Sequence, residues 1–293
     1  MAEAEALQRQ LLEAQNPDGG WGYVNGSSSW TEPTALSVLA LEAQGLKREA
    51  FQHACRWLMR TQRSDGGWPP NASVPTSTWV TSLAALALFE NGLAADQHHR
   101  AIGWLLGQMQ PPLNPVAELV LRFRSAVLPP EPQGGSPWFP GTAAWIAPTA
   151  LSILALSQAD CRNGPSPFTS SVLTARQYIL SRRCRDGGWN HGGSRFLAEN
   201  ATSYPEMTGM ALLALAGVPD SELVRPLKIA EAQLAQATSN EARCWLQLAL
   251  KRHNVPFTES RAELPCRSTR DIALRLLALA GDSPRNGLIT ATA

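Results

Sequence analysis

The feature that most constrains the fold is a tetrapeptide, D-G-G-W, that occurs three times, at residues 18–21, 65–68 and 186–189. The first two tryptophans stand 47 residues apart, and so do Thr34 and Thr81, which follow them. Self-similarity at a fixed period of this size is typical of architectures built from repeated structural units. The sequence therefore predicts an array of similar units.

Two kinds of segment alternate along this array. Alignment on the repeated threonine brings together apolar segments at 28–41, 74–88, 143–156 and 202–215, with a weaker fifth copy at 270–281. They are rich in Ala and Leu and nearly free of charge, which predicts helices buried on every side. Residues 54–62, 99–110 and 175–183 instead have apolar residues at i, i+3 and i+4, with charges between them. This pattern predicts amphipathic helices with one solvated face.

The D-G-G-W motif suits the corner between an outer amphipathic helix and an inner apolar one. Its glycines permit the positive φ that a tight corner needs, and its aspartate can accept hydrogen bonds from exposed amides. The tryptophan can fill the gap between adjacent units while its indole N–H bonds to a carbonyl. We interpret Pro137-Trp138, after Gly134-Gly135, as a decayed fourth copy.

These segments resemble the prenyltransferase and squalene-oxidase repeat of terpenoid cyclases, including squalene-hopene cyclase-like proteins, and of protein prenyltransferases. Q-x-x-D-G-G-W at 62–68, the related copy at 15–21 and the T-A-L-x-x-L-A-L inner segments carry the resemblance. It implies an all-α protein, an (α/α)-toroid with about six inner and six outer helices around a central cavity. We expect a single toroid domain over residues 1–285 and a flexible tail over 286–293.

The motifs that carry the chemistry of the resembled families are absent. The closest two of the eight aspartates are 11 residues apart, so neither the protonating D-x-D-D motif nor the magnesium-binding D-D-x-x-D motif occurs. The zinc-ligand spacing of protein prenyltransferases, D-x-C followed by Y-x-x-H, does not occur either. We therefore expect no metal and no cofactor.

The repeat nevertheless predicts a candidate site. Equivalent positions in a closed ring point to equivalent places, so positions two and four residues before the repeat threonine should gather at one rim of the cavity. The candidate acids are Glu206 and Glu32, and the candidate ligand contacts are Trp30, Trp79, Trp145, Tyr204 and the loop residue His191. A structural role is the alternative, because the helix dipole favours Glu in a first turn and tryptophans can pack between units.

Two functions stay open at this point. In the first, the toroid binds an isoprenoid or another apolar small molecule and transforms it by acid-initiated chemistry. In the second, it is a non-catalytic toroid that binds a peptide or partner protein. The sequence does not decide whether the chain is an enzyme, and a single toroid leaves room for a partner chain.

Composition excludes other classes of function. The formal net charge is +1 and no run of Lys or Arg is long enough to offer a phosphate-binding surface, so we expect no nucleic-acid binding. No apolar run reaches the roughly 18 residues of a membrane span. The five cysteines are scattered and include no C-x-x-C pair, which favours a reduced, cytoplasmic setting.

Overall fold

The fold is an inner ring of helices surrounded by an outer layer. The computed structural model describes residues 2–46, 49–89, 94–109, 134–163, 168–192, 201–258 and 264–290. Within these ranges every regular element is a helix, apart from two isolated β-bridges. The expected all-α class is confirmed.

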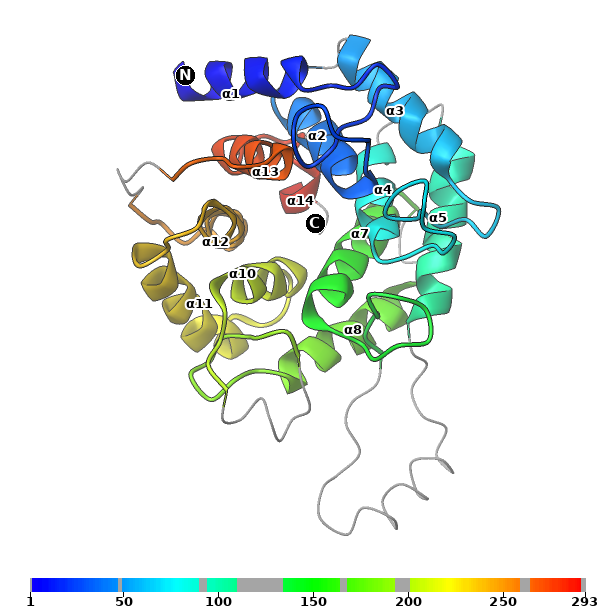
Figure 1. The fold of residues 1–293 in the computed structure, drawn as a ribbon. Coiled ribbons are helices and arrows are strands. Elements are labelled where there is room, and N and C mark those ends of the chain that lie inside the picture. Colours follow the sequence, from blue (N-terminus) through cyan, green and yellow to red (C-terminus); the bar gives the residue numbers. More distant parts are fainter. Residues whose placement is uncertain are drawn as a thin grey trace.

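Six helices of the described chain make the inner ring. They are α2 (Thr31–Ala43), α4 (Val80–Leu88), α7 (Ile146–Asn163), α10 (Pro205–Ala214), α12 (Asn240–Arg252) and α13 (Thr269–Leu279). Each packs against the next, and α13 packs against α2, so the ring closes between the last unit and the first (Figure 1). Every residue of α2 and α4 is buried, as their apolar sequences predict.

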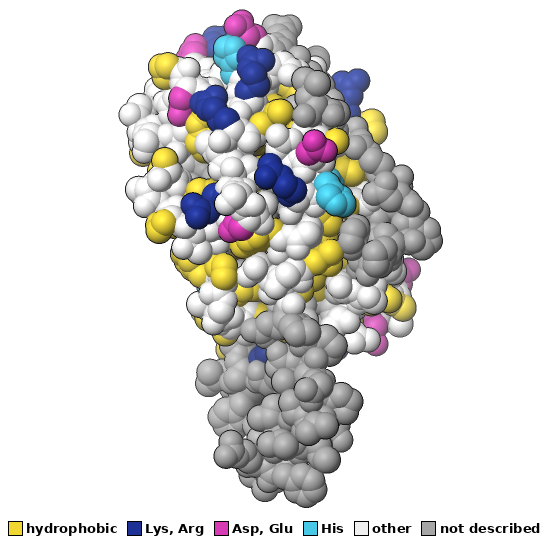
Figure 2. Space-filling model, turned by 90° about the vertical axis from the view of Figure 1, so that its right-hand side faces the viewer, with side chains coloured by type: hydrophobic (Ala, Val, Ile, Leu, Met, Phe, Trp, Pro, Cys, Tyr) yellow, Lys and Arg dark blue, Asp and Glu magenta, His cyan; other side chains and the backbone are white. Residues whose placement is uncertain are grey.

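The outer layer covers the inner ring with amphipathic helices. It consists of α1 (Ala2–Glu13), α3 (Glu49–Thr61), α5 (Ala95–Gln108), α8 (Phe168–Ser181) and α11 (Asp220–Ala235). On α3, Phe51 and Leu58 face the core while Arg56 and Arg60 are exposed. Figure 2 shows charged side chains of both signs over the face that carries α3 and α5. The sixth connection, between α12 and α13, contains no helix in its described residues, 253–258 and 264–268. The described residues as a whole therefore supply five outer helices.

Each D-G-G-W tryptophan joins an outer helix to an inner one. Trp21, Trp68 and Trp189 are fully buried. Their indole N–H groups donate to the carbonyls of Leu11, Leu58 and Ile179 at 2.7, 2.8 and 2.7 Å, and their backbone amides donate to Oγ1 of Thr34, Thr81 and Thr208 at 2.9, 2.9 and 3.1 Å. The expected wedge role is confirmed, and the repeat threonine is its anchor.

The aspartate and glycines complete the corner. Asp18 accepts from the amide of Gly20 at 3.0 Å and from the hydroxyl of Ser29 at 2.7 Å. Gly19 has a φ of +90°, and a Cβ on Gly20 would come within 2.6 Å of the Ser29 Cβ. Only glycine fits both positions, because the first needs a left-handed backbone and the second has no room for a side chain.

The third unit shows how the motif decays. Here Ser136 takes the tryptophan's place, because its amide donates to Thr149 Oγ1 at 2.8 Å. The interpretation of Pro137-Trp138 as the decayed D-G-G-W core is therefore wrong in register. Trp138 lies two residues beyond the anchored position.

A short C-terminal helix closes one end of the ring. Helix α14 (Gly287–Thr290) packs against α4, α7 and α12, and Figure 1 shows it in the middle of the ring. Asn286 donates to the carbonyls of Leu277 and Ala280 at 2.9 and 3.2 Å, and Leu288 is fully buried. Residues 286–290 of the expected tail are packed into the ring. Residues 291–293 lie outside the described ranges.

Replacing a staple tryptophan tests the wedge role. Trp68→Ala should lower the free energy of unfolding by about 3–5 kcal/mol, because it removes a fully buried ring and its hydrogen bond. Urea unfolding measures this change. Trp104→Ala, on the less buried α5 side chain, is the comparison and should cost less. An unchanged midpoint for Trp68→Ala would contradict the wedge role.

The aspartates predict a pH dependence of stability. Burial alone would raise the pKa of Asp186, but hydrogen bonds from Ser203 and Gly188 outweigh it and hold the pKa below 3.8. Folding thus favours the ionised Asp186 carboxylate. Its contribution to the stability of the folded protein is fully present above the ordinary aspartate pKa and is lost as pH falls through the lowered pKa.

Asp186→Asn should therefore cost about 1.5–3 kcal/mol at pH 7, and the difference from wild type should shrink as pH falls from 5 to 2. Urea titrations across this range measure it, with exposed Asp220→Asn as control. A difference that stays constant with pH would contradict the assignment.

Candidate binding site at the open end of the ring

The loops after the staples link neighbouring units at the N-terminal ends of the inner helices. We call the residue whose amide donates to the repeat threonine the anchored position: Trp21, Trp68, Ser136 or Trp189. The backbone carbonyl two residues after it accepts a hydrogen bond from a backbone amide at the start of the preceding inner helix. The donors Thr269, Thr31, Trp79 and Ile146 pair with the carbonyls of Tyr23, Pro70, Trp138 and His191 at 2.9, 2.8, 3.2 and 3.1 Å. Because the same bond recurs from unit to unit, these loops form a collar around this end of the ring.

Aromatic side chains gather on this collar. We call Tyr23, Trp30, Trp79, Trp138, Trp145, His191 and Tyr204 the aromatic rim. All seven are partly or well exposed. Ring centroids lie 5.4 Å apart for Tyr23 and Trp30, 4.8 Å for Trp79 and Trp138, 6.5 Å for Trp145 and His191, and 5.2 Å for His191 and Tyr204. All five predicted ligand contacts belong to this rim.

In the second unit the stretch from the staple tryptophan to the staple serine is one residue longer than in the first, and the stretch from that serine to the anchor threonine is one residue shorter. Ser77 donates to Asp65 at 2.8 Å, as Ser29 does to Asp18, so Ser77 belongs to the staple. Thr78 then takes the place of Trp30, because its amide bonds to the staple carbonyl in the same way. Counted from the staple serine, Trp79 corresponds to Thr31, whereas counted from the anchor threonine it corresponds to Glu32.

The threonine anchor fixes which residues face the ring axis. An α-helix turns about 100° per residue, so a residue two positions before an outward-facing threonine points inward. This directs Glu32, Trp79, Ala147 and Glu206 toward the ring axis at the collar end, which we call the mouth. One turn deeper on each inner helix lies what we call the second layer: Leu36, Leu83, Leu151, Met210, Trp245 and Leu274, none more than 6% exposed. Below the acidic mouth, the ring is therefore lined by large, mostly apolar side chains.

Glu32 belongs to a network of charges at the seam that closes the ring. Its carboxylate lies 2.7 Å from Arg270 Nε and also accepts the Tyr23 hydroxyl. Arg270 also donates to Glu241 at 2.9 Å. Burial lowers the pKa of Arg270, but the two carboxylates outweigh it and hold the pKa above its ordinary value. Burial, with Glu32 beside it, raises the pKa of Tyr23.

These contacts separate the two candidate acids. Glu32 is held by a guanidinium and a phenol and does not face the apolar surroundings that acid chemistry needs. Glu206 is partly exposed and, among the described residues, accepts one hydrogen bond, from Ser239 Oγ at 3.3 Å. Ser239 is the N-cap of α12, so a favourable helix dipole also acts on Glu206. Of the two, Glu206 is the carboxylate left open at the mouth.

Four residues at the mouth escaped the sequence analysis. Arg270 and Glu241 pair across the first turns of α13 and α12, Tyr23 lies in the first collar loop, and Trp245 lies one turn below Glu241. The α12 segment, N-E-A-R-C-W-L-Q-L-A-L-K-R, contains no threonine anchor and therefore could not be aligned. Tyr23 had a signal, since it stands two residues after Trp21 as His191 does after Trp189.

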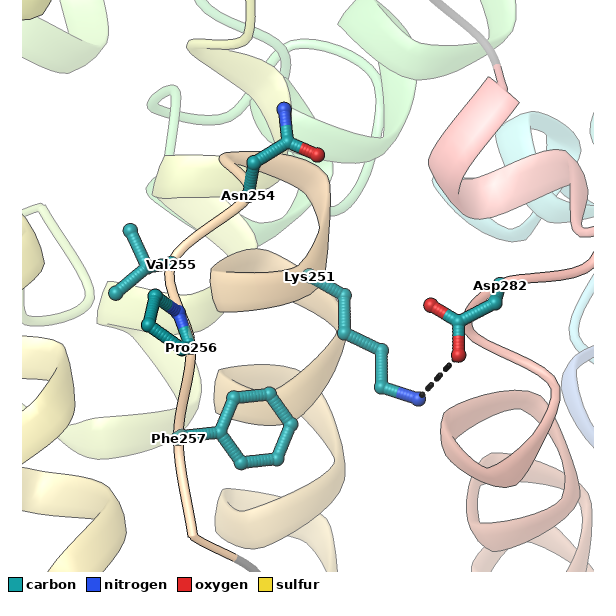
Figure 3. A pocket seen from close by; sticks show the side chains of 6 residues that line it. All are labelled: Lys251, Asn254, Val255, Pro256, Phe257 and Asp282. Carbon is teal, nitrogen blue, oxygen red and sulfur yellow. Dashed lines mark hydrogen bonds and ion pairs between the residues drawn. The ribbon is translucent and has the colours of Figure 1, made fainter.

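Two clefts within the described residues border the ring. One, of about 390 Å³, lies where α12 and α13 end, and is lined by Val255, Pro256 and Phe257 beside the Lys251–Asp282 ion pair at 3.5 Å (Figure 3). The other, of about 330 Å³, runs between α1 and the start of α13 and includes Tyr23 and Cys266. Neither is lined by the predicted acids.

The described residues offer no metal centre and no membrane-spanning helix. They contain no group of three His, Cys, Asp or Glu side chains that could hold a metal ion. Asp186 and Cys184, two possible metal-ligand types that stand close together, are otherwise engaged. Asp186 accepts hydrogen bonds from the Gly188 amide and the Ser203 hydroxyl. Burial raises the pKa of the Cys184 thiol and so disfavours its thiolate form. No helix in the described ranges is long and apolar enough to cross a membrane.

Comparison with known proteins identifies the fold. No protein-family model and no curated protein matches the chain. Among solved structures, ent-copalyl diphosphate synthase from Streptomyces platensis aligns with a TM-score of 0.55 at 18% identity, covering 86% of this chain and 50% of that one. An α-amylase from Clostridium perfringens aligns at 0.61 and 11% identity (95% and 97% coverage), and a GH76 α-mannanase from Bacteroides thetaiotaomicron at 0.58 and 8% (96% and 95%).

The chain has the (α/α)-toroid fold of terpene cyclases. The same toroid occurs in the mannanase, and all these identities are low, so the likeness extends to the fold alone. The chain spans half the length of the synthase.

The seam network predicts a stability change. Arg270→Met leaves Glu32 and Glu241 without their cation and should cost about 3–5 kcal/mol. Adding Glu32→Gln should recover part of this loss, because one uncompensated carboxylate is removed. Urea unfolding of the single and double variants measures the coupling. An Arg270→Met variant as stable as wild type would show that the network does not hold the seam.

Proposed function

We propose that the toroid binds an isoprenoid, or a similarly apolar small molecule, at the aromatic rim. The observation that carries this proposal is the arrangement of the two ends of the ring. The collar end presents partly exposed aromatic faces above an apolar second layer, whereas α14 packs into the other end. Aromatic side chains offer large apolar surface at little entropic cost, which suits recognition of an extended hydrocarbon.

The residues of the rim divide the work. Trp145, His191 and Tyr204 form one continuous aromatic group, through contacts at 6.5 and 5.2 Å. Tyr204 is 48% exposed, so its ring would lose water when a ligand covers it. Trp30 and Trp79 lie in the other two aromatic groups, each in contact with one partner ring. A ligand that spans the mouth meets aromatic faces from several units.

Binding can be tested with simple isoprenoids. Equilibrium dialysis with radiolabelled farnesol should give saturable binding of about one molecule per chain. Trp145→Ala and Tyr204→Ala should each weaken it about tenfold or more, because each removes aromatic contact area. Trp104→Phe, on the outer helix α5, is the matched control and should bind as wild type does. Absence of saturable binding of farnesol and of the longer geranylgeraniol would contradict the proposal.

A second function is favoured by one observation. The second layer is almost fully buried, so an occupant could rest on the rim without entering the ring. A peptide or partner chain would use the rim in this way, as a non-catalytic binding face. Failure of every isoprenoid to bind, together with intact folding, would favour this alternative.

If the toroid also transforms its ligand, Glu206 is the acid that the mouth offers. Glu206→Gln should then abolish turnover, measured by gas chromatography of the products, and leave farnesol binding and the melting temperature nearly unchanged. Glutamine keeps the acceptor for Ser239 but has no acidic proton to give. Glu222→Gln, on the surface of α11, is the control. Turnover that survives Glu206→Gln would remove Glu206 from this role.

A further inference from the structure

The indole N–H of Trp245 is buried and has no hydrogen-bond partner among the residues that the structure describes. Trp245 is 2% exposed, so bulk water does not supply an acceptor for this N–H group. The staple tryptophans differ, since the N–H groups of Trp21, Trp68 and Trp189 all donate to carbonyls. A buried donor without an acceptor costs about 1–3 kcal/mol. Its retention is explained if a ligand supplies the acceptor.

Trp245 lies directly below the mouth. Trp245 is four residues after Glu241 and therefore lies on the same face of α12. Glu241 accepts a hydrogen bond from Arg270, which also pairs with Glu32 at the mouth, so this face of α12 is directed toward the ring axis. A Cβ on Gly209 would lie 2.6 Å from the Trp245 carbonyl carbon, so α10 and α12 are in close contact here and the backbone of Trp245 is held in place. Its neighbour in the second layer on α10 is Met210, whose flexible thioether can move aside for a ligand atom.

The charges at the mouth select against anions. Its inward-facing first-turn residues in the described chain are Glu32, Glu206 and Glu241, against one cation, Arg270. Arg270 is already engaged by two of these carboxylates. Helices α4 and α7 add no acidic residue in their first turns. A diphosphate would therefore meet net negative charge, whereas a neutral oxygen would not.

We infer that the ligand is an uncharged isoprenoid that bears an oxygen acceptor, as an alcohol, aldehyde or ketone does, and that Trp245 Nε1–H donates to that oxygen. This inference rests on the proposed function and names the ligand class of the same site. Trp245 then acts as a specificity-determining residue at the deep end of the site, and the aromatic rim contacts the hydrocarbon chain.

The test compares three probes with the same fifteen-carbon chain: farnesol, the hydrocarbon farnesene and farnesyl diphosphate. Farnesol should bind about tenfold more tightly than farnesene, the ratio expected for one buried hydrogen bond. Trp245→Phe should abolish this ratio and leave farnesene binding unchanged, while Trp104→Phe should preserve it. Farnesyl diphosphate should bind at least tenfold more weakly than farnesol, with a gap that narrows as salt is added.

A second measurement needs no variant. In ¹⁵N-labelled wild-type protein, the Trp245 indole N–H resonance should move downfield with farnesol and stay in place with farnesene. Equal affinities of farnesol and farnesene, an equal shift with both, or tighter binding of the diphosphate would overturn the inference and leave the proposed function standing. Failure of all three probes to bind would overturn both.

Discussion

The hydrogen bond between the staple tryptophan amide and the repeat threonine determines the rest of the structure. It recurs at Thr34, Thr81, Thr149 and Thr208, with Ser136 in place of the tryptophan in the third unit. The threonine side chain is fully buried in each case. Because this bond turns the threonine outward, it sets the rotation of each inner helix, and thus which side chains reach the ring axis. The hydrogen bond that fixes the fold therefore also determines which side chains face the ring axis and are available to a ligand.

Closure of the ring makes a second demand, which charges meet. The first and last units meet where α13 packs against α2, and the same seam holds Glu32, Arg270 and Glu241. Deeper along the seam, Arg275 pairs with Glu3 at 2.7 Å and contacts Gln247 at 3.2 Å. Polar contacts therefore join helices that the repeat alone does not match. Glu32 takes part in this closure. The equivalent Glu206 lies away from the seam and accepts its hydrogen bond from Ser239.

The sequence predicted what depends on repetition and missed what departs from it. The staples, the inner helices and the rim residues Trp30, Trp145 and Tyr204 follow from a pattern shared by several units, so alignment locates them. The second unit keeps the tryptophan-to-threonine spacing but displaces the staple serine by one residue, and alignment cannot detect this until Ser77 is seen to bond to Asp65. Trp245 and Arg270 belong to units without a staple, and the ion pairs of Arg270 join α13 both to the neighbouring α12 and to α2, near the other end of the sequence. Helix α14 was missed because four residues carry no periodic signal.

The central claim is that the collar end of the ring, built by the recurring loop-to-helix hydrogen bonds, is the end that binds a ligand. Hydrogen exchange of the donor amides of Thr31, Trp79 and Ile146, measured with and without farnesol, tests it most directly. The account predicts that farnesol slows exchange at these amides and leaves the outer cleft around Val255 and Phe257 unchanged. Slowing confined to that cleft, or to the end closed by α14, would contradict it.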